Sequence, residues 1–89
     1  SQKEVTMPEE LVGEVSHWFG NINVAGIKLS GTLSVGDRVH IVGHTTDFEQ
    51  VIASMQLDNE EIAEANPGDE IGVKLESRAR SGDSVYRVF

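Results

Sequence analysis

The stretch Val35-Gly36-Asp37-Arg38-Val39-His40-Ile41-Val42 sets a pattern that the chain repeats twice more, over residues 67–75 and 81–89. In each copy a Gly-Asp pair precedes a run in which apolar residues alternate with others. Glycine permits the positive φ that a tight turn needs, and aspartate can bond the backbone beyond it. Alternation with a period of two places the apolar side chains on one face of a strand. The pattern therefore predicts an all-β domain of short strands and sharp turns.

Six strands are expected from this periodicity, over residues 11–19, 24–29, 38–42, 48–57, 70–75 and 84–89. Such spacing predicts a small six-stranded closed β-barrel with mostly antiparallel strands, because closure removes exposed strand edges. The expected core consists of apolar residues on the inner faces of these strands: Leu29, Val39, Ile41, Met55, Ile71, Val73 and Leu75.

The remaining segments are expected to be irregular. Residues 1–10 are polar, contain Pro8 and are interpreted as a flexible leader, so that residues 11–89 make a single domain. The acidic segment 58–65 is interpreted as one helical turn at most, because it is too short for an independent helix. The pattern alone leaves open which face of the first strand points inward.

The composition excludes several classes of site. The 89 residues include no cysteine, which excludes disulfides and thiolate-bound metals. No apolar run is long enough to span a bilayer, and the N-terminus lacks a basic-then-apolar signal pattern, so a soluble cytoplasmic protein without membrane contact is expected. Fifteen acidic and seven basic residues give a formal net charge of −8, which argues against generic binding to DNA or RNA.

Two short segments are candidate binding residues. The loop His44-Thr45-Thr46-Asp47 offers donors, acceptors and an imidazole between two strands, where binding residues often lie. Local turn chemistry is the alternative interpretation of this loop. Trp18 and Phe19 are adjacent in a strand, so only one of them can face the core. The other is expected to be covered by a loop or to serve as a docking or stacking anchor.

No catalytic, metal, cofactor or nucleotide site is predicted. His40, His44 and Asp47 carry groups that bind divalent metals, but His40 is expected on the outward face of a strand and His44 in a loop, so their spacing does not imply convergence. The chain lacks the phosphate loop G-x-x-x-x-G-K-[ST], and neither GTP nor ATP is expected to bind. A nucleophile-elbow pattern is also absent from the sequence.

The segments Gly31-Thr32-Leu33-Ser34-Val35-Gly36-Asp37-Arg38-Val39 and Ala65-Asn66-Pro67-Gly68-Asp69-Glu70-Ile71-Gly72-Val73, with the apolar strand between them, carry a family resemblance. They resemble the second domain of translational GTPases of the elongation factor Tu type, and the resemblance covers residues 11–88. The stretch Gly43-His44-Thr45-Thr46-Asp47-Phe48 with Ser54-Met55-Gln56 is similar to small stand-alone prokaryotic elongation-factor-like proteins. This resemblance implies the six-stranded barrel of that domain, which is also appended to other proteins, including collagenase-like peptidases.

A non-catalytic binding or adaptor module that engages a protein or ribonucleoprotein partner is the function favoured by these observations. Three alternatives stay open on the sequence alone. The chain could be an RNA-end binder, since the second domain of elongation factors helps to hold the aminoacylated end of tRNA. It could be a small enzyme, or an accessory domain detached from a peptidase or GTPase encoded elsewhere. The sequence indicates no oligomeric state.

Overall fold

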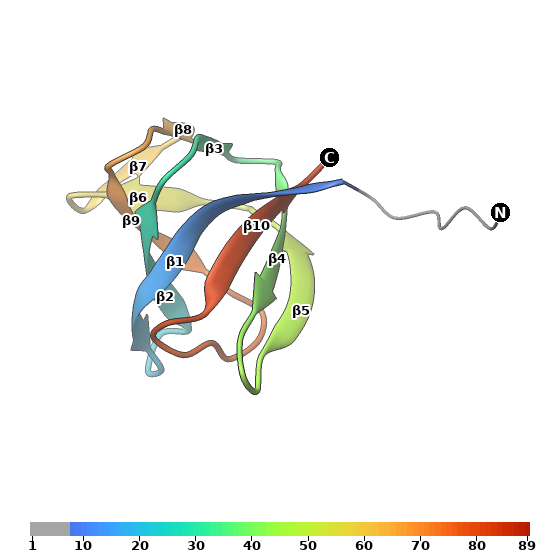
Figure 1. Cartoon of the computed structure of the whole chain (residues 1–89). Helices are drawn as coiled ribbons and strands as arrows, with labels where there is room; N and C mark the ends of the chain where they lie inside the picture. Colours follow the sequence, from blue (N-terminus) through green and yellow to red (C-terminus); the bar gives the residue numbers. More distant parts are fainter. Residues whose placement is uncertain (1–7) are drawn as a thin grey trace, which may run out of the picture.

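The computed structural model describes residues 8–89, which contain ten strands (Figure 1). In chain order the strands are β1 (Glu9–Phe19), β2 (Val24–Leu29), β3 (Leu33–Ser34), β4 (Arg38–Val42), β5 (Asp47–Val51), β6 (Met55–Leu57), β7 (Glu60–Ile62), β8 (Glu64–Ala65), β9 (Glu70–Lys74) and β10 (Ser84–Val88). The predicted strands over 24–29 and 38–42 match β2 and β4. No helix long and apolar enough to cross a membrane occurs in the described part of the chain.

Eight of the strands form one sheet in the order β5-β4-β10-β1-β2-β9-β6-β7, and β3 pairs with β8 in a second, two-stranded sheet. Every pairing is antiparallel, which confirms the predicted all-β, mostly antiparallel class. The predicted six-stranded closed barrel is wrong, because the large sheet has eight strands and no ladder joins β5 to β7 within residues 8–89. Figure 1 shows that this sheet is strongly curved, with β1 and β10 in front and β6 behind.

The buried side chain of Gln50 connects two strands that are not neighbours in the large sheet. Gln50 on β5 is only 6% exposed. Its amide nitrogen donates to the carbonyl of Lys74 at 3.1 Å, and its amide oxygen accepts from the backbone N–H of Glu76 at 2.7 Å. These two bonds connect β5 to the end of β9, although the two strands are not neighbours in the sheet.

The three Gly-Asp pairs form three copies of the same turn. Gly36, Gly68 and Gly82 have φ values of 97°, 95° and 95°. In each turn the aspartate carboxylate accepts a hydrogen bond from the backbone N–H three residues earlier, with distances of 2.9 Å for Ser34–Asp37, 2.9 Å for Asn66–Asp69 and 2.8 Å for Arg80–Asp83. The aspartate N–H donates to the carbonyl of that same residue. The aspartates thus bond the backbone before the turn, and not beyond it as expected.

The core lies on the concave side of the curved sheet and contains all seven residues that the alternation predicted. Leu29, Val39, Ile41, Met55, Ile71, Val73 and Leu75 are each at most 3% exposed. From β1 the core receives Val12 and Val15, which are three residues apart. The β1–β10 register shifts between Leu11 and Gly13, so a simple period of two does not hold in this strand.

The expected strand over residues 48–57 is interrupted at residues 52–54, and β5 and β6 lie on either side of the break. The buried positions change from even to odd numbers across it, since Gln50 before the break, Ile52 at its start and Met55 after it are buried. The expected helical turn in 58–65 is also wrong. Asp58 and Asn59 have φ values of 53° and 67°, and they connect β6 and β7 as a two-residue hairpin. Asp and Asn tolerate this left-handed conformation, which favours such hairpin turns.

The predicted leader lies mostly outside the described residues, which begin at Pro8. Glu9 and Glu10, which the sequence analysis assigned to the leader, belong to β1 and pair with Val88 and Arg87 of β10.

We predict that Asp83→Ala lowers the free energy of unfolding by about 1–3 kcal/mol, because it leaves the backbone N–H of Arg80 without its partner in a buried turn. Asp83 is only 4% exposed, and its bond to Arg80 is 2.8 Å long. Asp69→Ala breaks the equivalent bond where water can replace it, so a smaller loss of about 0.5–1.5 kcal/mol is expected. Urea denaturation of both variants measures the two losses, and equal losses would contradict the role given to burial.

Candidate functional site

Three connections meet at one end of the fold, at the bottom of Figure 1: the β1–β2 turn, the β4–β5 loop and the long β9–β10 connection. The first and third are joined by a 2.8 Å hydrogen bond from the N–H of Leu75 to the carbonyl of Asn23. The second and third are in contact at Gly43, where an added Cβ would overlap the carboxylate of Asp83. These contacts fix the three connections relative to one another. We call this region the loop end.

A pocket of about 710 Å³ opens at the loop end. Its lining comes from the β1–β2 hairpin and the β9–β10 connection and comprises Trp18, Gly20, Asn23, Arg78, Ala79, Arg80 and Ser81. Trp18 is half-buried and packs against the core, whereas Arg78 and Arg80 are exposed. Within residues 8–89 neither arginine forms an ion pair. Two exposed arginines and one tryptophan are therefore among the residues that line this pocket.

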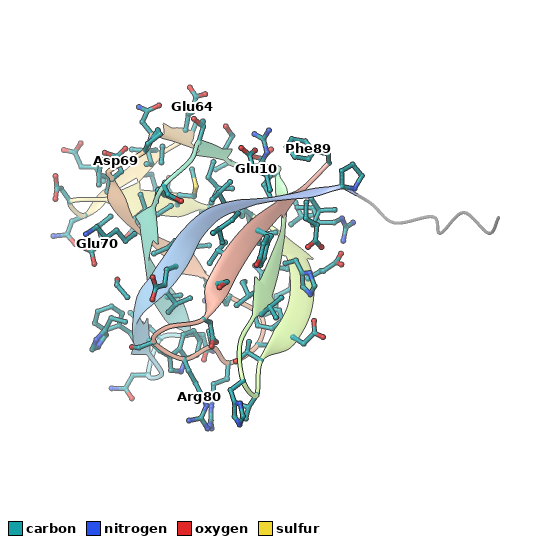
Figure 2. The ribbon with its side chains drawn as sticks, in the orientation of Figure 1. Glu10, Glu64, Asp69, Glu70, Arg80 and Phe89 are labelled. Carbon is teal, nitrogen blue, oxygen red and sulfur yellow. The ribbon has the colours of Figure 1, made fainter. Side chains whose placement is uncertain are left out.

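The loop-end pocket differs in charge from the opposite end of the molecule. Figure 2 shows Arg80 at the bottom, and Glu10, Glu64 and Asp69 at the top. Arg78 and Arg80 are two of only seven basic residues in a chain of net charge −8. The pocket is accordingly a local positive site on an acidic protein, which favours an anionic ligand group.

The four residues of the predicted binding loop differ in burial and in their contacts, and their role in binding stays a prediction. His44 and Thr45 are exposed at the tip of the β4–β5 loop, whereas Thr46 is buried at 6% exposure and its carbonyl accepts the N–H of Gly43 at 2.7 Å. Asp47 belongs to β5 and contacts His40 instead of His44. Turn chemistry therefore accounts for Thr46, and the hydrogen-bond partner of Asp47 is His40.

The second predicted pair, Trp18 and Phe19, divides between the two sides of β1. Trp18 contributes to the core and to the loop-end pocket. Phe19 is 47% exposed and lies against the ring of His17, with ring centroids 4.2 Å apart. The arginines that complete the pocket were missed, because residues 78–82 were interpreted only as a loop. A pair of arginines two residues apart was the signal available in the sequence.

A second polar cluster lies on the outer face of the sheet, around His40. Its Nδ1 is 2.8 Å from Oε2 of Glu9, and its Nε2 is 2.6 Å from Oδ1 of Asp47. One ligand atom from each of Glu9, His40 and Glu49 lies within 4.8 Å of the other two, so these three residues could hold a metal ion. Of the three residues considered in the sequence analysis, His40 and Asp47 are in contact, and His44 does not belong to this cluster. Glu9 was missed because it was assigned to the leader.

The contacts of His40 raise the pKa of its imidazole above the ordinary value of 6.5. The hydrogen bond to Asp47 is the largest cause, and the hydrogen bond and charge of Glu9 act in the same direction. Partial burial of the ring opposes them. Both ring nitrogens can donate only in the imidazolium form, so the two carboxylates favour the protonated ring.

No protein-family model matches the chain. A Methanocaldococcus jannaschii protein described as an uncharacterized protease is 38% identical over 76 residues, which cover 84% of this chain and only 19% of that protein. Two crystal structures of the C-terminal domain of a Geobacillus thermoleovorans protein, described as a U32 peptidase, share the fold at 20% identity. The match to one of these structures has a TM-score of 0.82 and covers 98% of this chain and 98% of that domain. The other, a selenomethionine variant, has a TM-score of 0.81 and covers 85% of this chain and 96% of that domain.

These similarities overturn the resemblance to translational GTPases and to elongation-factor-like proteins, which is wrong. Its motifs were the Gly-Asp turns around residues 36–37 and 68–69 and the strands beside them. A positive-φ glycine and a carboxylate bonded to the backbone are requirements of this turn, and any small antiparallel domain can use it. Such motifs therefore identify the class of fold and not the family.

We predict that His40 stabilises the fold more at pH 5.5 than at pH 8. A raised pKa in the folded state gives a contribution that is complete below the unfolded pKa of about 6.5 and is lost as the pH rises through the folded value. The free energy of unfolding of His40→Gln should fall below that of the wild type by up to about 1 kcal/mol at low pH and converge with it at high pH. Gln56→Ala is the control, since an exposed, non-titrating position should give a difference independent of pH. Urea titrations in a chelating buffer measure both, and a constant difference for His40→Gln would contradict the prediction.

Proposed function

We propose that this chain is a non-catalytic accessory domain that works beside a peptidase domain and binds polypeptide at the loop-end pocket. The similarity to the protein described as an uncharacterized protease carries the first part of this proposal, since it extends over 84% of the chain. The fold shared with the C-terminal domains of the protein described as a U32 peptidase supports it. The catalytic domain is assigned to the part of such proteins that this chain does not match, because the match covers 19% of the relative.

The geometry of the histidine cluster supports a non-catalytic role. A serine or cysteine nucleophile needs a general base within hydrogen-bond distance, and that base must have a free nitrogen. His40 has one carboxylate at 2.8 Å and another at 2.6 Å, one on each ring nitrogen. Neither nitrogen is left to accept a proton from a nucleophile. Peptide hydrolysis is accordingly assigned to the partner domain.

The loop-end pocket supports the binding role and suggests the chemistry of the ligand. A guanidinium group recognises a carboxylate through two parallel hydrogen bonds, and an indole ring provides apolar contact area. Arg78, Arg80 and Trp18 offer both kinds of contact within one pocket of about 710 Å³. An acidic segment of polypeptide fits these groups, because its carboxylates pair with the arginines while neighbouring side chains contact the indole.

We predict that the double variant Arg78→Gln/Arg80→Gln binds a fluorescein-labelled acidic peptide at least about tenfold more weakly than the wild type, a loss of about 1.4 kcal/mol of binding energy. Trp18 is the only tryptophan, so a change in its emission on titration reports binding at this pocket. Fluorescence polarisation measures the affinity of both proteins.

The matched control is Lys28→Gln/Arg38→Gln, which removes the same formal charge from two exposed positions outside the pocket. A change of less than about threefold is expected for this control. Equal weakening by both double variants would show that net charge alone governs binding and would refute the pocket. Tighter binding of a short RNA than of the acidic peptide would favour the RNA-end alternative.

A chimera tests the accessory role separately. The matched 76-residue segment of the M. jannaschii relative is either deleted or replaced by this chain, and hydrolysis of casein and of a short neutral peptide is measured. Deletion is expected to raise KM for casein with little change for the short peptide, and this chain is expected to restore the parent value. Hydrolysis by the isolated 89-residue chain would contradict a non-catalytic role.

A further inference from the structure

We propose that Glu9, His40 and Glu49 form a binding site for a divalent transition metal, with zinc as the representative ion. The three residues come from β1, β4 and β5 and meet on the outer face of the sheet. His40 and Glu49 are register partners across β4 and β5, and Glu9 reaches them from β1 across β10. The site is independent of the loop-end pocket, with which it shares no residue.

The distances already approach those of a coordination shell. Two ligand atoms held at 2.0–2.2 Å by a tetrahedral zinc ion are about 3.3 Å apart. Nδ1 of His40 and Oε2 of Glu9 are 2.8 Å apart, and the three ligand atoms lie within 4.8 Å of one another. The side chain of Glu49 is 44% exposed and that of Glu9 is 30% exposed. Both carboxylates therefore belong to partly exposed side chains, whose rotation would bring the three ligand atoms closer together.

Asp47 supplies a second, independent feature of metal sites. A histidine that binds a metal through one ring nitrogen usually donates the N–H of its other nitrogen to a carboxylate, which fixes the tautomer and the ring orientation. Oδ1 of Asp47 lies 2.6 Å from Nε2 of His40. This contact keeps a proton on Nε2, so the metal ion would replace the proton that Nδ1 shares with Glu9. The imidazole is thus oriented toward the proposed ion before the ion binds.

The charge of the cluster also favours a cation. Three carboxylates, from Glu9, Asp47 and Glu49, lie around one imidazole, and the guanidinium of Arg38 is 3.7 Å from Glu49. A divalent ion would offset the repulsion among these carboxylates on a chain of net charge −8. The mixed set of one nitrogen and two oxygens suits zinc and similar ions, whereas calcium and magnesium prefer ligand sets made of oxygen alone.

Isothermal titration of the full chain with zinc chloride, after removal of adventitious metal by a chelator, tests the proposal. One zinc ion per chain is expected to bind. His40→Gln and Glu49→Gln should each weaken zinc binding at least tenfold, and Asp47→Asn should weaken it by about 10- to 100-fold through loss of the ring orientation. Cobalt(II) serves as a spectroscopic probe, because its visible absorption reports coordination by the imidazole.

His44→Gln is the matched control, since His44 is exposed in the loop that follows β4 and lies outside the cluster. Its affinity for zinc should stay within twofold of the wild type. Circular dichroism checks that each variant is folded, and the exposed Glu49 provides a variant that does not disturb packing. Absence of saturable zinc binding would overturn the proposal. Equal losses in His40→Gln and His44→Gln would also overturn it, because they would indicate scattered surface binding.

Discussion

The reciprocal hydrogen bonds within the Gly-Asp turns are the constraint on which the rest of the structure depends. Each turn fixes the start of a strand, because the glycine supplies a positive φ and the aspartate both accepts from and donates to the residue three positions earlier. The three strands that follow, β4, β9 and β10, carry much of the core. Asp83 has a further role, since its buried carboxylate lies against Gly43 and holds the β4–β5 loop beside the β9–β10 connection. The turn that starts a strand thus also builds the loop end.

The sequence predicted the parts of the fold that local chemistry determines. Strands β2 and β4 and the seven core residues follow from a period of two between strong turn signals. The errors fall where tertiary packing changes the period: the register shifts in β1 and the break at residues 52–54. Segment 58–65 was wrong because Asp58 and Asn59 both adopt positive φ without a glycine. The closed barrel was wrong because no ladder joins the edge strands β5 and β7 among the described residues, and periodicity does not reveal which strands pair.

The candidate sites were harder to predict from the sequence than the fold, because they depend on tertiary contacts. The sequence analysis selected neighbours along the chain, such as His44 with Asp47 and Trp18 with Phe19. The fold instead groups Trp18 with Arg78 and Arg80, about sixty positions away, and Asp47 with His40 and Glu9. The fold as a whole brings these residues together, so spacing in a single sequence could identify the chemical types but not the partners.

The distribution of charge gives the two proposed sites a common physical basis. On a chain of net charge −8, the proposed acidic ligand would be repelled by most of the surface and attracted at the loop end, where Arg78 and Arg80 lie without an ion-pair partner among the described residues. Around His40 the same excess of carboxylates has the opposite effect, because three of them converge on one imidazole and attract a cation. The distribution of charge therefore supports both proposals, an anionic ligand at the loop end and a cation beside His40.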